Sequence, residues 1–175
     1  MKLVAIEFLM VYYPSEDSFL TLDVCRYAVR LINAKSLLDM GCGTGFIGIN
    51  IWKEFKIDVT FSDIDESALE ETRSNCKKEG MNNATILKSD LFSAISRKFD
   101  LVCFNAPYLP GKRENNYDIV GGSIGNELLY AFLKEIPNFS RFAVITYSSL
   151  SNFSLLHQFS ELFKLSKKLD FEELY

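Results

Sequence analysis

The chain has 175 residues, of which 48% are hydrophobic and 24% are charged, with a formal net charge of −4 and a pI near 5.1. This length and hydrophobic content predict one domain over residues 1–175, and its apolar stretches are too short to span a bilayer, so we expect a cytoplasmic protein with no membrane partner. The acidic balance disfavours nucleic acid as a partner, because neutralisation of phosphates supplies most non-specific affinity.

The predicted elements begin with an N-terminal segment and helix over about residues 1–33. Residues 15–33 start with a capping serine and two acidic residues, and apolar side chains then recur at helical spacing. A strand over 36–40 leads directly into the glycine-rich turn 41–45, and a helix follows over 46–55. Strand, turn and helix therefore form one unit.

Strands and helices go on alternating along the rest of the chain. The predicted strands cover 57–63, 84–90, 99–104 and 142–147, and the predicted helices cover 66–78, 126–139 and 152–163, with a short helical turn at 91–95. Residues 164–175 alternate enough for one further strand and the beginning of another, so we expect the last strand to be truncated at Tyr175. This order predicts an α/β fold with a doubly wound, mostly parallel, seven-stranded sheet.

The glycine-rich turn after the first strand fits two kinds of ligand. The Gly-x-Gly-x-x-Gly spacing that starts at Gly43 matches the dinucleotide fingerprint, and Asp63 lies about 20 residues further on, where that motif places a ribose-binding carboxylate. The alternative motif starts at Asp39, whose carboxylate suits the ammonium group of S-adenosylmethionine. In that motif the backbone approaches the cofactor closely at Gly41, Gly43 and Gly45.

Three successive predicted strands end in an aspartate, which favours S-adenosylmethionine. Asp63 would accept hydrogen bonds from both ribose hydroxyls, because an ionised carboxylate is an acceptor only. Asp90 would accept a bond from the adenine amino group, with the N–H of Leu91 beside it. Each aspartate alone is equally typical of a turn or a helix cap, but Asp39, Asp63 and Asp90 together, with the glycine-rich turn, point to one crevice at the carboxyl ends of the strands.

A polar stretch follows the buried fourth strand and consists of Asn105, Ala106, Pro107 and Tyr108. An NH2 group on an sp² carbon is a poor nucleophile, and a site that methylates it needs acceptors for both N–H groups. The Asn105 side-chain oxygen and the Ala106 carbonyl would be those acceptors, with the Ala106 backbone restricted by Pro107. Tyr108 would pack on the flat face of the substrate group. In isolation, Asn-x-Pro is more typical of an ordinary turn.

The stretch from Asn105 to Tyr108 resembles the Asn-Pro-Pro-Tyr signature of the HemK-like group of class I S-adenosylmethionine-dependent methyltransferases. Val11 to Ser18 is similar to the Val-Tyr-Glu-Pro-x-Glu-Asp-Thr segment of the short eukaryotic and archaeal branch, and Gly121-Gly122 is similar to its loop after the signature. That branch methylates the glutamine of the Gly-Gly-Gln loop in class I translation termination (release) factors. Ala106 and Tyr13 depart from the pattern, where the family has proline and glutamate.

The resemblance implies a Rossmann-like class I methyltransferase fold, S-adenosylmethionine as cofactor, and N5-methylation of a glutamine in a termination factor. It also implies a heterodimer, because the short branch works with a small zinc-binding activator that adds to the free edge of the sheet, here near Ala84 to Lys88. The positions that match the family's cofactor site are Ser18, Asp39, Gly41, Gly43, Gly45, Asp63, Ile64, Asp90, Leu91 and Asn105.

Two other functions remain open from the residues alone. Methylation of an exocyclic base amine in RNA or DNA would use the same acceptor pair, and Lys112 and Arg113 are the local basic residues that favour it. A non-catalytic nucleotide-binding subunit would be consistent with the alanine at position 106. We expect no metal in this chain, because its cysteines form no Cys-x-x-Cys pair and are spread over Cys25, Cys42, Cys76 and Cys103.

Overall fold

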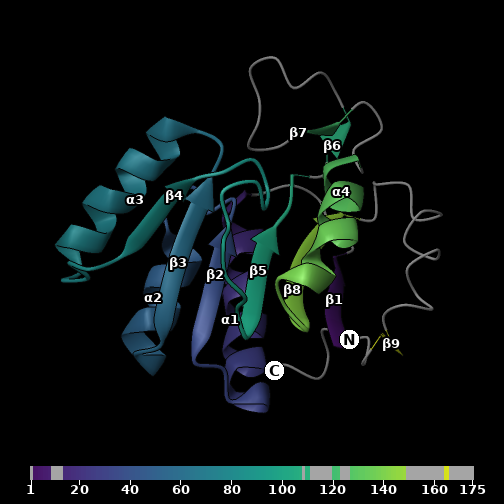
Figure 1. Cartoon of the computed structure of the whole chain (residues 1–175), viewed down its shortest axis with the longest axis horizontal. Coiled ribbons are helices and arrows are strands. Elements are labelled where there is room, and N and C mark those ends of the chain that lie inside the picture. The colour runs from purple at the N-terminus through teal and green to yellow at the C-terminus, as the bar shows by residue number, and fades with distance from the viewer. Residues whose placement is uncertain are drawn as a thin grey trace.

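A computed structural model describes residues 2–8, 14–107, 109–110, 120–122, 127–148 and 164–165. Its main element is a seven-stranded sheet in the order β4-β3-β2-β5-β8-β1-β9 (Figure 1). These strands are β1 (Lys2–Phe8), β2 (Ser36–Met40), β3 (Asp58–Asp63), β4 (Thr85–Lys88), β5 (Leu101–Asn105), β8 (Phe142–Ser148) and β9 (Lys164–Leu165). Neighbouring strands pair in parallel, and β6 (Leu109–Pro110) with β7 (Val120–Gly122) forms a separate parallel pair.

Helices cover both faces of this sheet, which confirms the predicted doubly wound α/β fold. The helices are α1 (Pro14–Ile32), α2 (Phe46–Phe55), α3 (Glu66–Lys78) and α4 (Glu127–Glu135), the last continued by a 3₁₀ turn over Ile136–Asn138. Side chains of α1, α2 and α3 belong to the core on one face, and side chains of α4 belong to the core on the other. In Figure 1, α4 accordingly lies in front of β8, and α1 lies behind β5.

Strand β5 shows why its sequence is apolar at consecutive positions. Leu101 and Cys103 are buried in the core under α1, whereas Val102 and Phe104 are buried in the core under α4. Successive side chains of a strand point to opposite faces, so a strand covered on both faces is apolar throughout. The polar residue Asn105 then ends the strand at the edge of the sheet where ligands bind in open α/β folds.

Local signals in the sequence fix where the helices begin and end. The Asp65 side chain caps α3 by accepting a bond from the N–H of Ser67 at 2.9 Å. Helix α2 starts after Gly45 and ends at Lys56, and both of these residues have left-handed backbone. The α4 helix tightens to a 3₁₀ turn at Pro137, because proline lacks the N–H that an α-helix needs.

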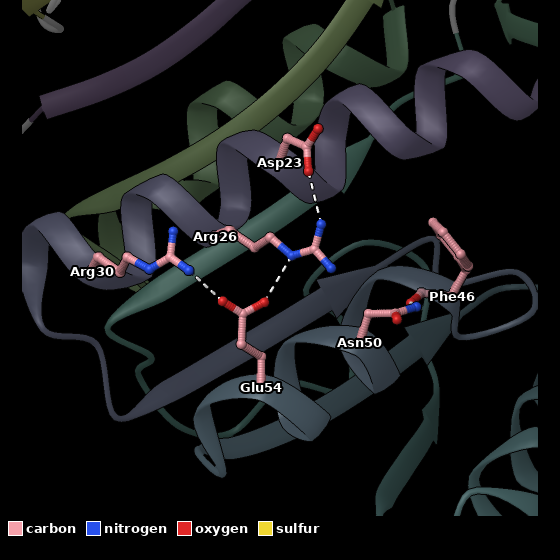
Figure 2. Close-up of polar contacts among 6 residues, drawn as sticks. All are labelled: Asp23, Arg26, Arg30, Phe46, Asn50 and Glu54. Carbon is pink, nitrogen blue, oxygen red and sulfur yellow. Dashed lines mark hydrogen bonds and ion pairs between the residues drawn. The ribbon is translucent and has the colours of Figure 1, made fainter. Parts of the chain in front are cut away.

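An ion-pair network ties α1 to α2 (Figure 2). Arg26 donates to Glu54 at 2.9 Å and to Asp23 at 2.8 Å, and Arg30 also binds Glu54. These side chains are between 32% and 63% exposed, so solvent screens each pair and leaves it worth about 1 kcal/mol or less. The network links α1 to α2 but contributes little to stability.

The N-terminal end of the chain differs from the prediction. Lys2–Phe8 is not only a connecting segment: it forms β1 inside the sheet, parallel to β8 from the pair Lys2 and Phe142 to the pair Phe8 and Ser148. At the other end of the chain, β9 pairs with β1 in parallel, and the further strand expected to begin before Tyr175 lies outside the described residues. Strand partners far apart in the sequence cannot be read from local patterns. The predicted helix over 152–163 lies outside the described residues.

Other predicted bounds are corrected by smaller amounts. Residues 91–95 form turns instead of a helix, and Leu91 has a left-handed backbone with φ of +45°. The third predicted strand is limited to Thr85–Lys88, and the strand predicted over 99–104 runs from Leu101 to Asn105. The edge strand β4 has no buried side chain, as is common for a strand with one uncovered edge.

Candidate active site

The topology brings the predicted site residues to one edge of the sheet. Strands β4, β3, β2 and β5 are neighbours and parallel, so their carboxyl ends lie side by side. Asp63 and Asn105 are the last residues of β3 and β5, and Asp39 is next to last in β2. Asp90 lies just beyond the end of β4, in the turn that follows. The four residues thus lie at one edge of the sheet although they are far apart in the sequence.

The glycine-rich loop is held by hydrogen bonds from two other elements. Gly43 N–H donates to the Asp63 carboxylate at 3.0 Å, and the Gly43 carbonyl accepts from the Thr72 hydroxyl at 2.8 Å. The Asn75 side chain donates to the carbonyl of Thr44 at 3.0 Å. Thr72 and Asn75 come from α3, and sequence reasoning missed both. Their spacing of three residues on one helix face was the only local signal.

Gly43 itself borders open space. Its φ is +53°, and a Cβ added there would meet no atom within 4 Å. Gly41 and Gly45 also have positive φ, of +61° and +76°. The loop therefore adopts a backbone that only glycine takes readily, and it leaves room at Gly43 for a ligand to approach the main chain.

Gly48 serves packing instead of ligand binding. A Cβ at this position would lie 2.4 Å from the Phe61 ring and 2.9 Å from Asp39 Oδ2. Helix α2 can therefore lie close on the sheet only with glycine here. The match to a dinucleotide fingerprint is thus explained in its last position by close packing between a helix and a strand, which any ligand of this loop would require equally.

Asp39 is a buried carboxyl group beneath the loop. It is 2% exposed, and its Oδ2 accepts a bond from Gly48 N–H at 2.8 Å. Burial raises the pKa of Asp39 from 3.8 to about 7, the bond from Gly48 opposes this, and the neighbouring Asp63 adds to it. The carboxyl therefore titrates near neutral pH. A ligand cation placed beside it would favour the ionised form.

Asp63 is fixed at the opposite side of the loop. Its Oδ2 accepts from Gly43 N–H at 3.0 Å, and its Oδ1 accepts from Asp65 N–H at 3.0 Å. Each carboxylate oxygen has two lone pairs, so both oxygens can accept one more bond from a ligand hydroxyl. Ile64, the next residue, is half-buried beside it. The carboxylate is thus oriented before any ligand arrives.

The turn after β4 is built by two serines. Asp90 N–H donates to the Ser93 hydroxyl at 3.1 Å, and the Ser89 hydroxyl donates to the carbonyl of Leu91 at 2.7 Å. These bonds hold Leu91 in its left-handed conformation, which is uncommon for a residue other than glycine. The Asp90 side chain is exposed at this turn. Sequence reasoning found Asp90 and Leu91 but not the serines that shape the turn.

Asn105 carries an acceptor that no described residue satisfies. Its side-chain Oδ1 is buried and lacks a hydrogen-bond partner, and among the described residues it shares this state with Ser62 Oγ. Leaving a buried acceptor unpaired costs about 1–3 kcal/mol, so such an atom indicates a missing donor. Next to it, Ala106 is 2% exposed, and its N–H donates to the Thr146 carbonyl at 3.3 Å. A ligand N–H would fit the Asn105 oxygen.

The remaining predicted positions are only partly described. Pro107 is half-buried after Ala106, and Tyr108 lies outside the described residues. Ser18 is half-buried near the start of α1, the helix that packs against β5 and β8. The structure thus brings the loop, the three aspartates and Asn105 together. Their roles toward a ligand stay predictions.

The described part of the chain has neither a metal-binding cluster nor a membrane-spanning helix. No three histidine, cysteine, aspartate or glutamate residues there lie together as a metal site would need. Nor does that part contain a helix whose length and apolar character would let it cross a membrane. The cysteines are all buried thiols, and burial raises the pKa of Cys76 to about 11.

Curated proteins with similar sequences include several methyltransferases. A Methanocaldococcus jannaschii protein, named as a proposed protein N5-glutamine methyltransferase, is 36% identical over 135 residues, or 74% of this chain and 66% of that protein. Ribosomal RNA small subunit methyltransferase C of Actinobacillus pleuropneumoniae is 41% identical over 76 residues, or 43% of this chain and 23% of that protein. Release factor glutamine methyltransferase of Fusobacterium nucleatum is 30% identical over 102 residues, or 57% of this chain and 29% of that protein. The chain spans less than two thirds of the length of each.

Solved structures and a family model agree on the class of protein. TrmN from Thermus thermophilus superposes with a TM-score of 0.57 at 18% identity, covering 83% of this chain and 44% of that one, which is a likeness of fold. The fold is the Rossmann-like fold of class I methyltransferases, as expected. A model of the family described as the methyltransferase small domain matches residues 24–126, more than half of the chain. The chain therefore belongs to the methyltransferase small domain family.

Proposed function

We propose that this chain is an S-adenosylmethionine-dependent protein-glutamine N5-methyltransferase whose substrate is a translation termination factor. The observation that carries the proposal is the buried, unpaired Oδ1 of Asn105 at the end of β5. Two relatives named for glutamine methylation, one of them on release factors, support the choice of an amide as substrate. Family membership supports S-adenosylmethionine as the cofactor.

The edge of the sheet offers a suitable group for each part of that cofactor. Asp39 would face the ammonium end, Asp63 would accept from the ribose hydroxyls, and Asp90 would accept from the adenine amino group. Gly41, Gly43 and Gly45 would let the backbone approach closely, and Ser18, Ile64 and Leu91 would line the same site. Open space at Gly43 and the exposed Asp90 side chain are consistent with this assignment. When bound, the cofactor supplies an electrophilic methyl group on its sulfonium.

The residues of the Asn105 stretch would hold the nucleophile. Asn105 Oδ1 accepts one N–H of the glutamine amide, and the carbonyl of Ala106 accepts the other. These two bonds turn the nitrogen lone pair toward the methyl group. Alignment of the two bound reactants then makes the largest contribution to catalysis and lowers the activation barrier by about 7–11 kcal/mol. The peptide that carries this carbonyl joins Ala106 to Pro107, whose ring restricts the backbone of Ala106. Tyr108 would cover the flat face of the amide.

We further propose that the chain acts as a heterodimer with a small zinc-binding activator. Strand β4 lies at one end of the sheet and is half-exposed, which suits addition of a strand from a partner near Ala84 to Lys88. In this heterodimer the activator would bind the zinc, and this chain would bind no metal.

An exocyclic base amine in ribosomal RNA is the second candidate substrate. A relative named for ribosomal RNA methylation favours it, and the same acceptor pair would fit any planar NH2 group. The net charge of −4 speaks against it, because the chain alone offers little attraction for phosphates.

One experiment separates the two candidates. The chain, purified with its activator, is incubated with methyl-labelled S-adenosylmethionine and either a termination factor or ribosomal RNA. We expect label on the glutamine of the Gly-Gly-Gln loop, located by mass spectrometry, and none when that glutamine is replaced. Label on RNA alone would establish the second candidate, and label on neither would refute both.

A further inference from the structure

A buried chain of hydroxyl groups lies beside Asn105, between α1 and β8. Thr21 is fully buried and Thr146 is 1% exposed, and their hydroxyl oxygens are hydrogen-bonded to each other. The Thr21 hydroxyl also donates to the backbone carbonyl of Asp17 at 2.6 Å. These hydrogen bonds therefore link β8, the strand beside β5, to the first turns of α1.

The direction of the protons in this chain follows from counting donors. Each threonine hydroxyl has one proton to donate. Thr21 gives its proton to the carbonyl of Asp17, so the proton between the two threonines must come from Thr146. The order is thus Thr146 to Thr21 to Asp17, and the proton of Thr146 points toward α1.

Thr146 is the direct neighbour of Asn105 across the sheet. The two residues are register partners in β8 and β5. Val144 and Cys103, which precede them by one alternation, lie in the same core cluster, so Thr146 and Asn105 share that face. Neighbouring strands are about 4.8 Å apart, so a hydroxyl at position 146 is within reach of the Asn105 side chain.

The two neighbours nevertheless do not satisfy one another. Asn105 Oδ1 has no donor among the described residues, although a buried hydroxyl lies on the adjacent strand. Buried acceptors are normally paired, so this arrangement needs a reason. The Thr146 proton is already committed to Thr21, and that commitment leaves the Asn105 oxygen unpaired.

We propose that Thr21 is a positioning residue for the acceptor site. By accepting the proton of Thr146, it prevents Thr146 from donating to Asn105 Oδ1, and it keeps that oxygen open for an N–H of the substrate amide. This inference rests on the proposed function for its kinetic consequence, but its structural content concerns only residues of this chain.

Replacing Thr21 provides the first test. In Thr21→Val the Thr146 hydroxyl loses its acceptor and turns to Asn105 Oδ1, where it competes with the substrate. We expect kcat/KM for the methyl acceptor to fall about threefold to tenfold, since one neutral hydrogen bond must then be broken before the substrate binds. Affinity for S-adenosylmethionine, measured by calorimetry, should change by less than about twofold.

Two double variants identify the hydroxyl as the cause. Thr21→Val with Thr146→Val removes the competing donor and should recover most of the lost kcat/KM. Thr21→Val with Thr146→Ser keeps a hydroxyl at position 146 and should stay as slow as Thr21→Val. A merely structural role for the pair predicts no such contrast once rates are referred to folded protein, measured by urea unfolding. Thr60→Val is the matched control. Thr60 is a buried threonine in β3, and its hydroxyl accepts a hydrogen bond from Arg97 at 2.9 Å.

A spectroscopic readout keeps the test independent of activity. In protein labelled with ¹³C at asparagine, the Asn105 side-chain carbonyl resonance should shift in Thr21→Val and return in the double valine variant. If the unchanged chain methylates no substrate, the proposed function fails, and this shift alone decides the inference. Wild-type turnover and an unshifted Asn105 resonance in Thr21→Val would overturn it, as would a double valine variant as slow as Thr21→Val.

Discussion

The glycine-rich loop and the end of β5 lie at the same edge of the sheet, but their polar groups are satisfied in opposite ways. The loop is held by Asp63, Thr72 and Asn75, which bind its backbone at 2.8–3.0 Å. At the end of β5, Asn105 keeps a buried oxygen without a partner. The difference indicates that the loop is a finished cradle, whereas the strand end is completed only by a ligand.

Asn105→Ala should have the largest effect on turnover and the smallest on folding. Removing a donor or acceptor that is preorganised for the reacting group typically costs about 10²–10³ in rate. The same change removes a buried unpaired oxygen, so the free energy of unfolding should hardly fall. Single-turnover methyl transfer and urea unfolding measure the two quantities.

Ala106→Pro is the control for the acceptor pair. Proline keeps the carbonyl at position 106 but removes the N–H that binds Thr146 at 3.3 Å. Because that bond is long and the carbonyl remains, turnover should be largely retained. A variant ranking in which Ala106→Pro is inactive and Asn105→Ala active would mean that the acceptor-pair account is wrong.

Gly48→Ala should be the most destabilising change in the loop region. The new Cβ would lie 2.4 Å from the Phe61 ring, in a core that cannot yield without moving α2. Overpacking of this kind typically costs about 1–3 kcal/mol of unfolding free energy. Urea unfolding measures it, and cofactor affinity of the folded fraction should be reduced less than stability.

Gly43→Ala is the matched comparison in the same loop. Its Cβ would meet no atom within 4 Å, so only the positive φ of +53° is strained, which costs about 1–2 kcal/mol. Here the larger loss should be in cofactor affinity, because the methyl occupies the open space beside the loop. Equal stability and affinity profiles for the two alanine variants would contradict the assignment of Gly48 to packing and Gly43 to the ligand.

Thr72→Val tests how far the loop depends on α3. The change removes the bond from the Thr72 hydroxyl to the Gly43 carbonyl at 2.8 Å. One such bond contributes about 0.5–1.5 kcal/mol, so cofactor affinity measured by calorimetry should fall by about threefold to tenfold. An unchanged affinity would show that the loop holds its shape without α3.

The raised pKa of Asp39 predicts that the stability of the fold depends on pH. Burial raises this pKa to about 7 from 3.8, so on raising the pH the unfolded chain loses the proton first. Stability from this group is therefore present at low pH and is lost between about pH 4 and pH 7. Unfolding measured across this range should show the decline, and Asp39→Asn should flatten it.

Cofactor binding should report the same carboxyl from the other side. An ammonium group beside Asp39 favours the ionised form, so binding near pH 7 should release protons. Calorimetry in buffers with different ionisation enthalpies measures the number released, and Asp39→Asn should abolish it. Binding without proton release at pH 7 would place the cation elsewhere.

Local patterns were sufficient for much of the fold and for the positions of the site residues. The helix predicted over 66–78 has those bounds as α3, since its cap, charges and stop signals are all within the segment. The strands before Asp39, Asp63 and Asn105 were found because a turn or polar residue ends each apolar run. The parallel direction of the strands then followed from the alternation of strands and helices.

Periodicity and turn chemistry act within a few residues, so the order of amino acids was enough to predict the α/β class, the glycine turn and the polar residues at the strand ends. The folded chain was needed to show that Lys2–Phe8 is a strand beside β8, and that Phe61 requires glycine at position 48. It alone also revealed the unpaired oxygen of Asn105 and the hydroxyl chain beside it. These features join residues far apart in the chain, and no local pattern encodes which distant group will be brought into contact.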